Sequence, residues 1–449
     1  MGLVKYLEGV NMSGVLDGSR ELDRRSSISN QDILDFTNSN WHQLLILGNG
    51  FDLECGLHSS FSDFELIRKI KINLLDAMYY NNVEEWIDNL IDSGITLWDI
   101  ILVQTKNSLW SDIESSIKDC VLDVSKYSVS NLTDFMISNI GKKQIRSNYN
   151  FIQKWTAVIP DFRAKVRTGY ARQFLSTIDE LILFYFVKLL DNMSIAVVDN
   201  RVISRVMLDQ LHIIEKEFAK YLKQQINYAY YCDSCRLIKE IWWYGQPSKS
   251  EYKVNSSLIN FNYTDPLNGI DDKYSMFNDG VINIHGSLED DQIIFGIDGM
   301  GCMSDENVMP FTKTYRLMIW NRVIKTNLFY GPVKGDKQMV TKVIKFYGHS
   351  LSPADYSYFQ SIFDDVDLYA GDTELIFFYR AHGNSNGEHG DGGGQQCDSR
   401  EARNDMVQKV VRLINSYGST LDNVDHGENM LHKLLLEGRL KVVELPKYM

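Results

Sequence analysis

Short apolar runs separated by polar segments predict the strands of a sheet in this chain. The first run, 43–47, leads directly into Gly48-Asn49-Gly50 and the acidic Asp52. An apolar run of this length that ends at glycines is typical of a buried strand followed by a tight turn. Five later runs share its apolar, β-branched or aromatic character: 257–262, 281–284, 292–295, 343–347 and 374–379. Several are too apolar for a half-exposed sheet, which favours parallel strands covered on both faces.

A second pattern fills the chain between the first two runs. Residues from about 64 to 250 carry apolar side chains three and four positions apart, as amphipathic helices do. The clearest such segments are 66–79, 110–121, 172–190 and 207–230. Ser62 and Glu65 fit a capping box, which predicts a helix beginning near Asp63. We therefore expect an α/β domain over 41–449 that is interrupted by a large helical insertion.

Three other segments complete the predicted organisation. Residues 1–40 are polar and lack the apolar core of a signal sequence, so we interpret them as a loosely docked arm. Residues 382–396 are rich in glycine, asparagine and histidine and predict a flexible surface loop. The segment 400–417 predicts an amphipathic helix, and Ser352 followed by Pro353 is typical of a helix start.

Composition narrows the class of protein. The chain has 449 residues, of which 44% are hydrophobic, enough for a large core. Its net charge of −13 opposes broad nucleic-acid binding. The apolar run 181–187 is far shorter than the roughly 20 residues of a membrane span. These features predict a cytoplasmic protein with free thiols. No metal is expected, because the single pair Cys232/Cys235 supplies only half of a zinc site.

Polar residues follow four of the predicted strands, where each strand ends. If the strands are parallel neighbours, these ends share the edge at which open α/β sheets bind ligands. The residues expected to converge there are Gly48 to Asp52, Asn262, Asp265, His285, Gly348 and Ser350. Glycine in the first turn would permit a positive φ and close approach of a ligand to the backbone. Each residue also has a plainer interpretation as a turn or helix cap. Their coincidence in four places favours a site.

These motifs resemble those of the AbiH-type bacteriophage abortive-infection proteins over roughly residues 44–380. The motifs are Gly48-Asn49-Gly50-Phe51-Asp52, Gly56-Leu57, Ser62-Asp63-Phe64, Trp110-Ser111-Asp112-Ile113-Glu114, Asn262-Tyr263-Thr264-Asp265, His285-Gly286, Phe295-Gly296-Ile297-Asp298 and Gly348-His349-Ser350. Their order is similar, more distantly, to that of sirtuin-like NAD-binding domains. This second resemblance implies a sirtuin-like, Rossmann-type and mostly parallel sheet flanked by helices.

The sirtuin-like resemblance also implies roles for the site residues. Gly48 and Gly50 would cradle the diphosphate of NAD, and Gly348 and Ser350 would hold the adenosine side. Asn49 and Asp52 are also expected to bind the cofactor. Asn262 and His285 would act at the nicotinamide ribose. Asp265 is a further expected cofactor-binding residue, but two residues separate it from Asn262, where the sirtuin-like pattern has one. The four-cysteine zinc module of deacylases is missing, which argues against deacylation.

The leading hypothesis is an anti-phage effector that binds NAD as its substrate and hydrolyses the nicotinamide–ribose bond. A different class of hypothesis is a non-catalytic sensor of NAD or ADP-ribose, and a third is a structural protein whose glycines only form turns. The sequence leaves open whether the protein forms a homo-oligomer. It also leaves open whether a phage-derived or host protein triggers it.

Overall fold

The structure is a computed structural model that describes residues 41–74, 83–102, 110–121, 159–160, 163–164, 178–246, 254–268, 276–320, 327–332, 339–381 and 394–446. The predicted arm, 1–40, lies outside the described residues, as does most of the predicted loop 382–396. The last three residues of that loop, 394–396, are helical and open α16, so the predicted loop extends too far.

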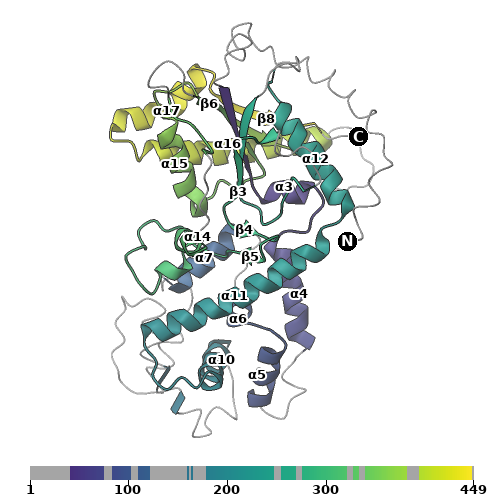
Figure 1. Ribbon diagram of the computed structural model, residues 1–449, viewed down its shortest axis with the longest axis vertical. Helices are drawn as coiled ribbons and strands as arrows, with labels where there is room; N and C mark the ends of the chain where they lie inside the picture. The colour runs from purple at the N-terminus through teal and green to yellow at the C-terminus, as the bar shows by residue number, and fades with distance from the viewer. Residues whose placement is uncertain are drawn as a thin grey trace.

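A six-stranded parallel sheet forms the upper part of the molecule (Figure 1). Its strands in chain order are β1 (Trp41–Leu47), β2 (Asn255–Asn260), β3 (Gly280–Asn283), β6 (Val340–Tyr347), β7 (Glu374–Tyr379) and β8 (Leu440–Glu444). Every neighbouring pair in the sheet is parallel. The spatial order β3-β2-β1-β6-β7-β8 is 3-2-1-4-5-6 when the strands are counted along the chain. This is the order of Rossmann-type folds, and the predicted α/β class is confirmed.

The sheet is the middle of three layers, with helices on both of its faces. Successive side chains of β1 point alternately to the two faces. Leu44 and Ile46 face a core shared with α15, α16 and α17, whereas Leu45 and Leu47 face a core shared with α3 and α12. Both sets are fully buried, because helices cover both faces of a parallel sheet. The covering helices are α3 (Asn49–Glu54), α12 (Tyr228–Trp243), α15 (Tyr356–Asp365), α16 (Gly394–Gly418) and α17 (Val424–Leu436).

Helices inserted between β1 and β2 form the lower part of Figure 1. They are α4 (Phe61–Leu74), α5 (Val83–Asp92), α6 (Leu97–Leu102), α7 (Trp110–Val121), α10 (Ile178–Asn192) and α11 (Asn200–Gln225), with α12 returning to the sheet. None of the helices in the described part of the chain has the length and apolar character needed to cross a bilayer. The predicted helix 110–121 has the bounds of α7. The predicted capping box is wrong, because α4 begins two residues earlier and Ser60 bonds the N–H of Asp63.

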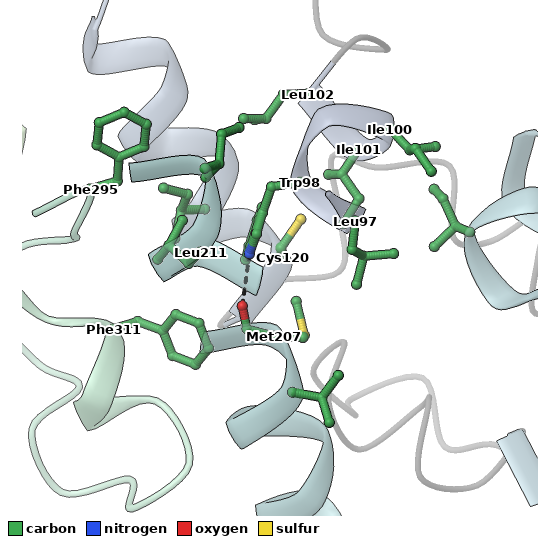
Figure 2. Close-up of a cluster of buried hydrophobic side chains, with 14 of the residues drawn as sticks. Leu97, Trp98, Ile100, Ile101, Leu102, Cys120, Met207, Leu211, Phe295 and Phe311 are labelled. Carbon is green, nitrogen blue, oxygen red and sulfur yellow. Dashed lines mark hydrogen bonds between the residues drawn. The ribbon is translucent and has the colours of Figure 1, made fainter. Parts of the chain in front are cut away.

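A core around Trp98 joins the inserted helices to the segment that follows the third strand (Figure 2). The indole Nε1–H of Trp98 on α6 donates to the carbonyl of Met207 on α11 over 2.9 Å. Phe295 and Phe311 pack into the same cluster. The insertion is therefore anchored to the chain that leads from His285 to α14 (Lys313–Ile319).

Two predicted features of the sheet need correction. The run 292–295 does not join the main sheet: β5 (Gln292–Ile293) pairs antiparallel with β4 (Gly286–Ser287) in a separate ribbon. The edge strand β8 was not expected, because it is short and mixes apolar with charged residues that are half-buried or exposed. It follows α17 in the chain and pairs parallel with β7.

Candidate functional site

The carboxyl ends of the central strands share one edge of the sheet, as the sequence predicts. The parallel ladder continues one residue past each strand: the N–H of Phe261 donates to Leu47, and the N–H of Gly48 donates to Tyr347. The N–H of Ile284 donates to Asn260 in the same way, directly before His285. The turns after β1, β2, β3 and β6 therefore form one rim. Strand order reverses between β1 and β6, where Rossmann-type folds bind nucleotides.

The glycines of this rim pack two turns against each other. The N–H of Gly50 donates to the carbonyl of Gly348 over 2.8 Å. A Cβ added at Gly50 would lie 2.8 Å from the Cα of Gly348, and one added at Gly48 would lie 2.5 Å from the Cα of His349. Neither Gly48 nor Gly50 has a positive φ, whereas Gly348 does, at +70°. The expectation that Gly48 and Gly50 adopt a positive φ is therefore wrong. Their missing side chains instead allow the two turns to lie in contact.

The other predicted binding residues occupy different surroundings. Asp52 is buried and accepts hydrogen bonds from the hydroxyls of Tyr230 and Thr264. Burial raises the pKa of Asp52 to about 7, against the lowering effect of both hydroxyls. Asp265 caps its own turn by accepting the N–H of Leu267. Two further residues, Asn49 and Ser350, accept hydrogen bonds from Ser59 and from the N–H of Ser352 respectively.

Asn262 has an unusual environment. Its side chain is only 2% exposed, and neither its Nδ2 nor its Oδ1 has a hydrogen-bond partner among the described residues. A buried amide without partners costs free energy, on the order of 1–3 kcal/mol. Its backbone N–H is held by Oδ1 of Asn260, which fixes the turn. The side chain is thus kept buried with one acceptor and two donors unused.

His285 belongs to a pair of histidines that share one carboxylate. Its Nε2 lies 3.1 Å from Oδ1 of Asp355, and Nε2 of His349 lies 3.4 Å from Oδ2 of the same carboxylate. The Nδ1 of His349 accepts the N–H of Leu351 over 2.9 Å. An ionised carboxylate only accepts, so each histidine presents Nε2–H to Asp355. That tautomer leaves a lone pair on Nδ1 of His285.

A lysine completes this buried cluster. The Nζ of Lys313 lies 2.6 Å from Oδ1 of Asp355 and 2.6 Å from Oε1 of Glu114 on α7. Burial alone would raise the pKa of Asp355, but Lys313 and His285 hold it well below its usual value. Burial, and then Lys313, lowers the pKa of His285 to about 4. Asp355 is therefore an anion and His285 a neutral ring at physiological pH.

The comparison with protein families identifies the chain. The model of the family described as Bacteriophage abortive infection AbiH matches residues 44–378, three quarters of the sequence. The chain belongs to the AbiH family. This membership indicates a role in abortive infection of bacteriophage. The comparisons with curated proteins and with solved structures found no match. The likeness to sirtuin-like domains and the binding of NAD stay predictions.

Sequence reasoning about this AbiH protein missed part of the cluster. Asp355 lies just after Ser352 and Pro353, which predict only a helix start, and the structure places it in the short η7 (Pro353–Asp355). Glu114 stands in a family motif, but nothing local marks it as buried. No motif or pattern in the sequence indicates a functional role for Lys313. The thiols of Cys232 and Cys235 both lie on α12, and the absence of a metal there stays a prediction.

Proposed function

We propose that this AbiH protein is an abortive-infection effector that binds NAD at the rim of the sheet and hydrolyses its nicotinamide–ribose bond. The Rossmann strand order supports a nucleotide at the point where strand order reverses, between β1 and β6. The observation that carries the proposal is the buried amide of Asn262, which finds no hydrogen-bond partner in the described part of the chain and lies on the same rim as His285. A ligand with polar groups would satisfy that amide and offset its cost.

The reaction suits the groups at this rim. Hydrolysis of NAD takes up water, breaks the bond between C1′ and the nicotinamide nitrogen, and yields ADP-ribose, nicotinamide and a proton. The transition state resembles an oxocarbenium ion, as in glycoside hydrolysis. Nicotinamide leaves as a neutral group, so no strong acid is required. Asn262 would position the ribose or the water, and Nδ1 of His285 would accept the proton.

The rest of the cluster supports His285 in this role. Asp355 fixes the ring by accepting Nε2–H, and the imidazolium that forms on proton transfer would face an ionised carboxylate. Asn262 and His285 are both buried. On this proposal, a local opening of the rim would admit the nucleotide. Such a closed site suits an effector that must be silent before infection.

One observation favours a second candidate, a sensor that binds NAD or ADP-ribose without cleaving it. Burial and the Lys313 cation lower the pKa of His285 to about 4, which makes it a weak base at neutral pH. A weak base would still orient a ribose hydroxyl. Turnover separates the two candidates, since only the effector releases nicotinamide.

The test is incubation of the purified full-length chain with NAD and chromatographic measurement of free nicotinamide. Asn262→Ala and His285→Ala should each lower turnover by about 100-fold, and the double variant should lose little more, because the residues serve one transition state. Asn268→Ala is the matched control, since Asn268 is exposed on the same segment. Removing the unpartnered amide of Asn262 should leave the melting temperature unchanged or higher.

Three outcomes decide the matter. Loss of turnover in both variants, with normal melting and a normal control, supports the effector. NAD binding by calorimetry without nicotinamide release supports the sensor. Turnover by both variants at the wild-type rate would remove Asn262 and His285 from the mechanism, even if the chain does cleave NAD.

A further inference from the structure

The buried cluster beneath the rim has the ligand set of a metal site. Glu114, His285 and Asp355 each offer one ligand atom, and these three atoms lie within 4.8 Å of one another. Two carboxylates and an imidazole are a set that divalent transition metals bind in proteins. All three residues are buried, and they come from three separate segments of the chain.

A lysine already pairs with both carboxylates of this set. The Nζ of Lys313 is 2.6 Å from both carboxylate oxygens, the distance of short charge-assisted hydrogen bonds. A zinc ion would sit closer, at about 2.0–2.2 Å from each oxygen. The third proton of Lys313 is directed to the carbonyl of Ala354 over 3.4 Å. All three ammonium protons therefore have acceptors, and a metal ion could enter only if the ammonium left.

The lysine cannot easily move aside, because the chain fixes both its backbone and its stem. The N–H of Lys313 donates to Ile297, and Thr312 caps α14 directly before it. A Cβ added at Gly296 would lie 2.9 Å from Cγ of Lys313, so glycine is required beside the stem. On the same helix Arg316 pairs with Glu215 of α11, which anchors α14 to the insertion.

We propose that Lys313 is a permanent internal cation that fills the position of a divalent metal ion in the set Glu114–His285–Asp355. The cluster is thereby assembled without a metal. Lys313 acts as a positioning residue: it holds the carboxylate of Asp355, which in turn orients His285 and His349. The inference rests on contacts within the chain and stands whether or not the rim cleaves NAD.

The proposal predicts that removing the ammonium creates a metal site. Full-length wild type, Lys313→Ala, Glu114→Gln and the double variant Lys313→Ala/Glu114→Gln are treated with chelator and titrated with Co²⁺. Visible absorption reports binding, and melting temperature reports stability. Wild type and Glu114→Gln should show the same Co²⁺ absorption, because Glu114 binds no Co²⁺ while Lys313 is present. Chelator should not change the melting temperature of wild type. Lys313→Ala should melt lower, bind one equivalent of Co²⁺ and recover stability on binding.

The double variant is the specificity control, because it keeps only two of the three ligands. Its Co²⁺ response should be strongly reduced, and any absorption it retains measures ions bound elsewhere, for instance at Cys232 and Cys235. If Lys313→Ala does not fold alone, it is refolded with Co²⁺, and recovery of soluble protein supports the proposal. Two results would overturn it: a metal in wild type that Glu114→Gln removes, or a Lys313→Ala protein that gains neither Co²⁺ nor stability from it.

Discussion

Gly348 offers the sharpest test of how the rim is built. It lies at φ +70°, and a Cβ placed on it would be 2.3 Å from the amide nitrogen of Phe51 and 2.7 Å from the carbonyl carbon of Gly50. Gly56 supplies a matched control. It has a similar φ of +78°, but a Cβ there would meet nothing within 4 Å. Comparing alanine at the two positions separates the cost of backbone conformation from the cost of contact.

The expected magnitudes follow from these two terms. A left-handed conformation costs an alanine about 1–2 kcal/mol, and this applies to both variants. Forcing a methyl group into a packed contact adds about 1–3 kcal/mol, and this applies only to Gly348→Ala. At about 2 °C per kcal/mol for a chain of this size, Gly348→Ala should melt about 2–6 °C below Gly56→Ala.

The assay is thermal unfolding of both full-length variants in parallel, with nucleotide binding measured on the folded protein. Equal melting temperatures for the two variants would refute the contact between the turns. A normal melting temperature with lost nucleotide binding would show instead that the glycine serves only ligand approach. Valine at position 50 does not separate these roles, because its Cβ would also meet Gly348.

Two further predictions concern buried titratable side chains. Lys345 donates to Gln43 and to two carbonyls at the end of α12, so Lys345→Met should destabilise the chain by about 2–4 kcal/mol in urea unfolding. Lys342→Met, on the same strand but partly exposed, should change it by less than about 0.5 kcal/mol, and similar losses in both would contradict the reasoning. Burial raises the pKa of Asp52 to about 7. Between pH 4 and 7 the folded chain therefore keeps a proton that the unfolded chain has released. The free energy of unfolding should fall over this range as the pH rises, by at most about 4 kcal/mol. Asp52→Asn should flatten this pH dependence of the melting temperature, and parallel profiles would count against it.

The sequence by itself determined the class of fold and the place of the rim. Apolar runs such as 43–47 and 374–379 lie within strands that helices cover on both faces, and three- and four-residue periods mark helices such as α7. These properties are local, because burial on two faces or on one stripe is written into consecutive residues. The glycine and polar residues that follow the strands likewise predicted that Asn262 and His285 lie at the same edge of the sheet.

Only the tertiary structure decided what those residues contact. Lys313 and Asp355 are 42 residues apart, and His285 and Asp355 are 70 apart, so no local pattern links them. Charged residues in helical segments are normally exposed. Glu114 on α7 and Lys313 on α14 are buried here as an ion pair, and Lys313 also pairs with Asp355. The same holds for Gly48, Gly50 and Gly348, whose shared purpose is visible only once their turns touch. Contacts between segments that are distant in sequence depend on the topology and packing of the whole fold, which no local pattern encodes.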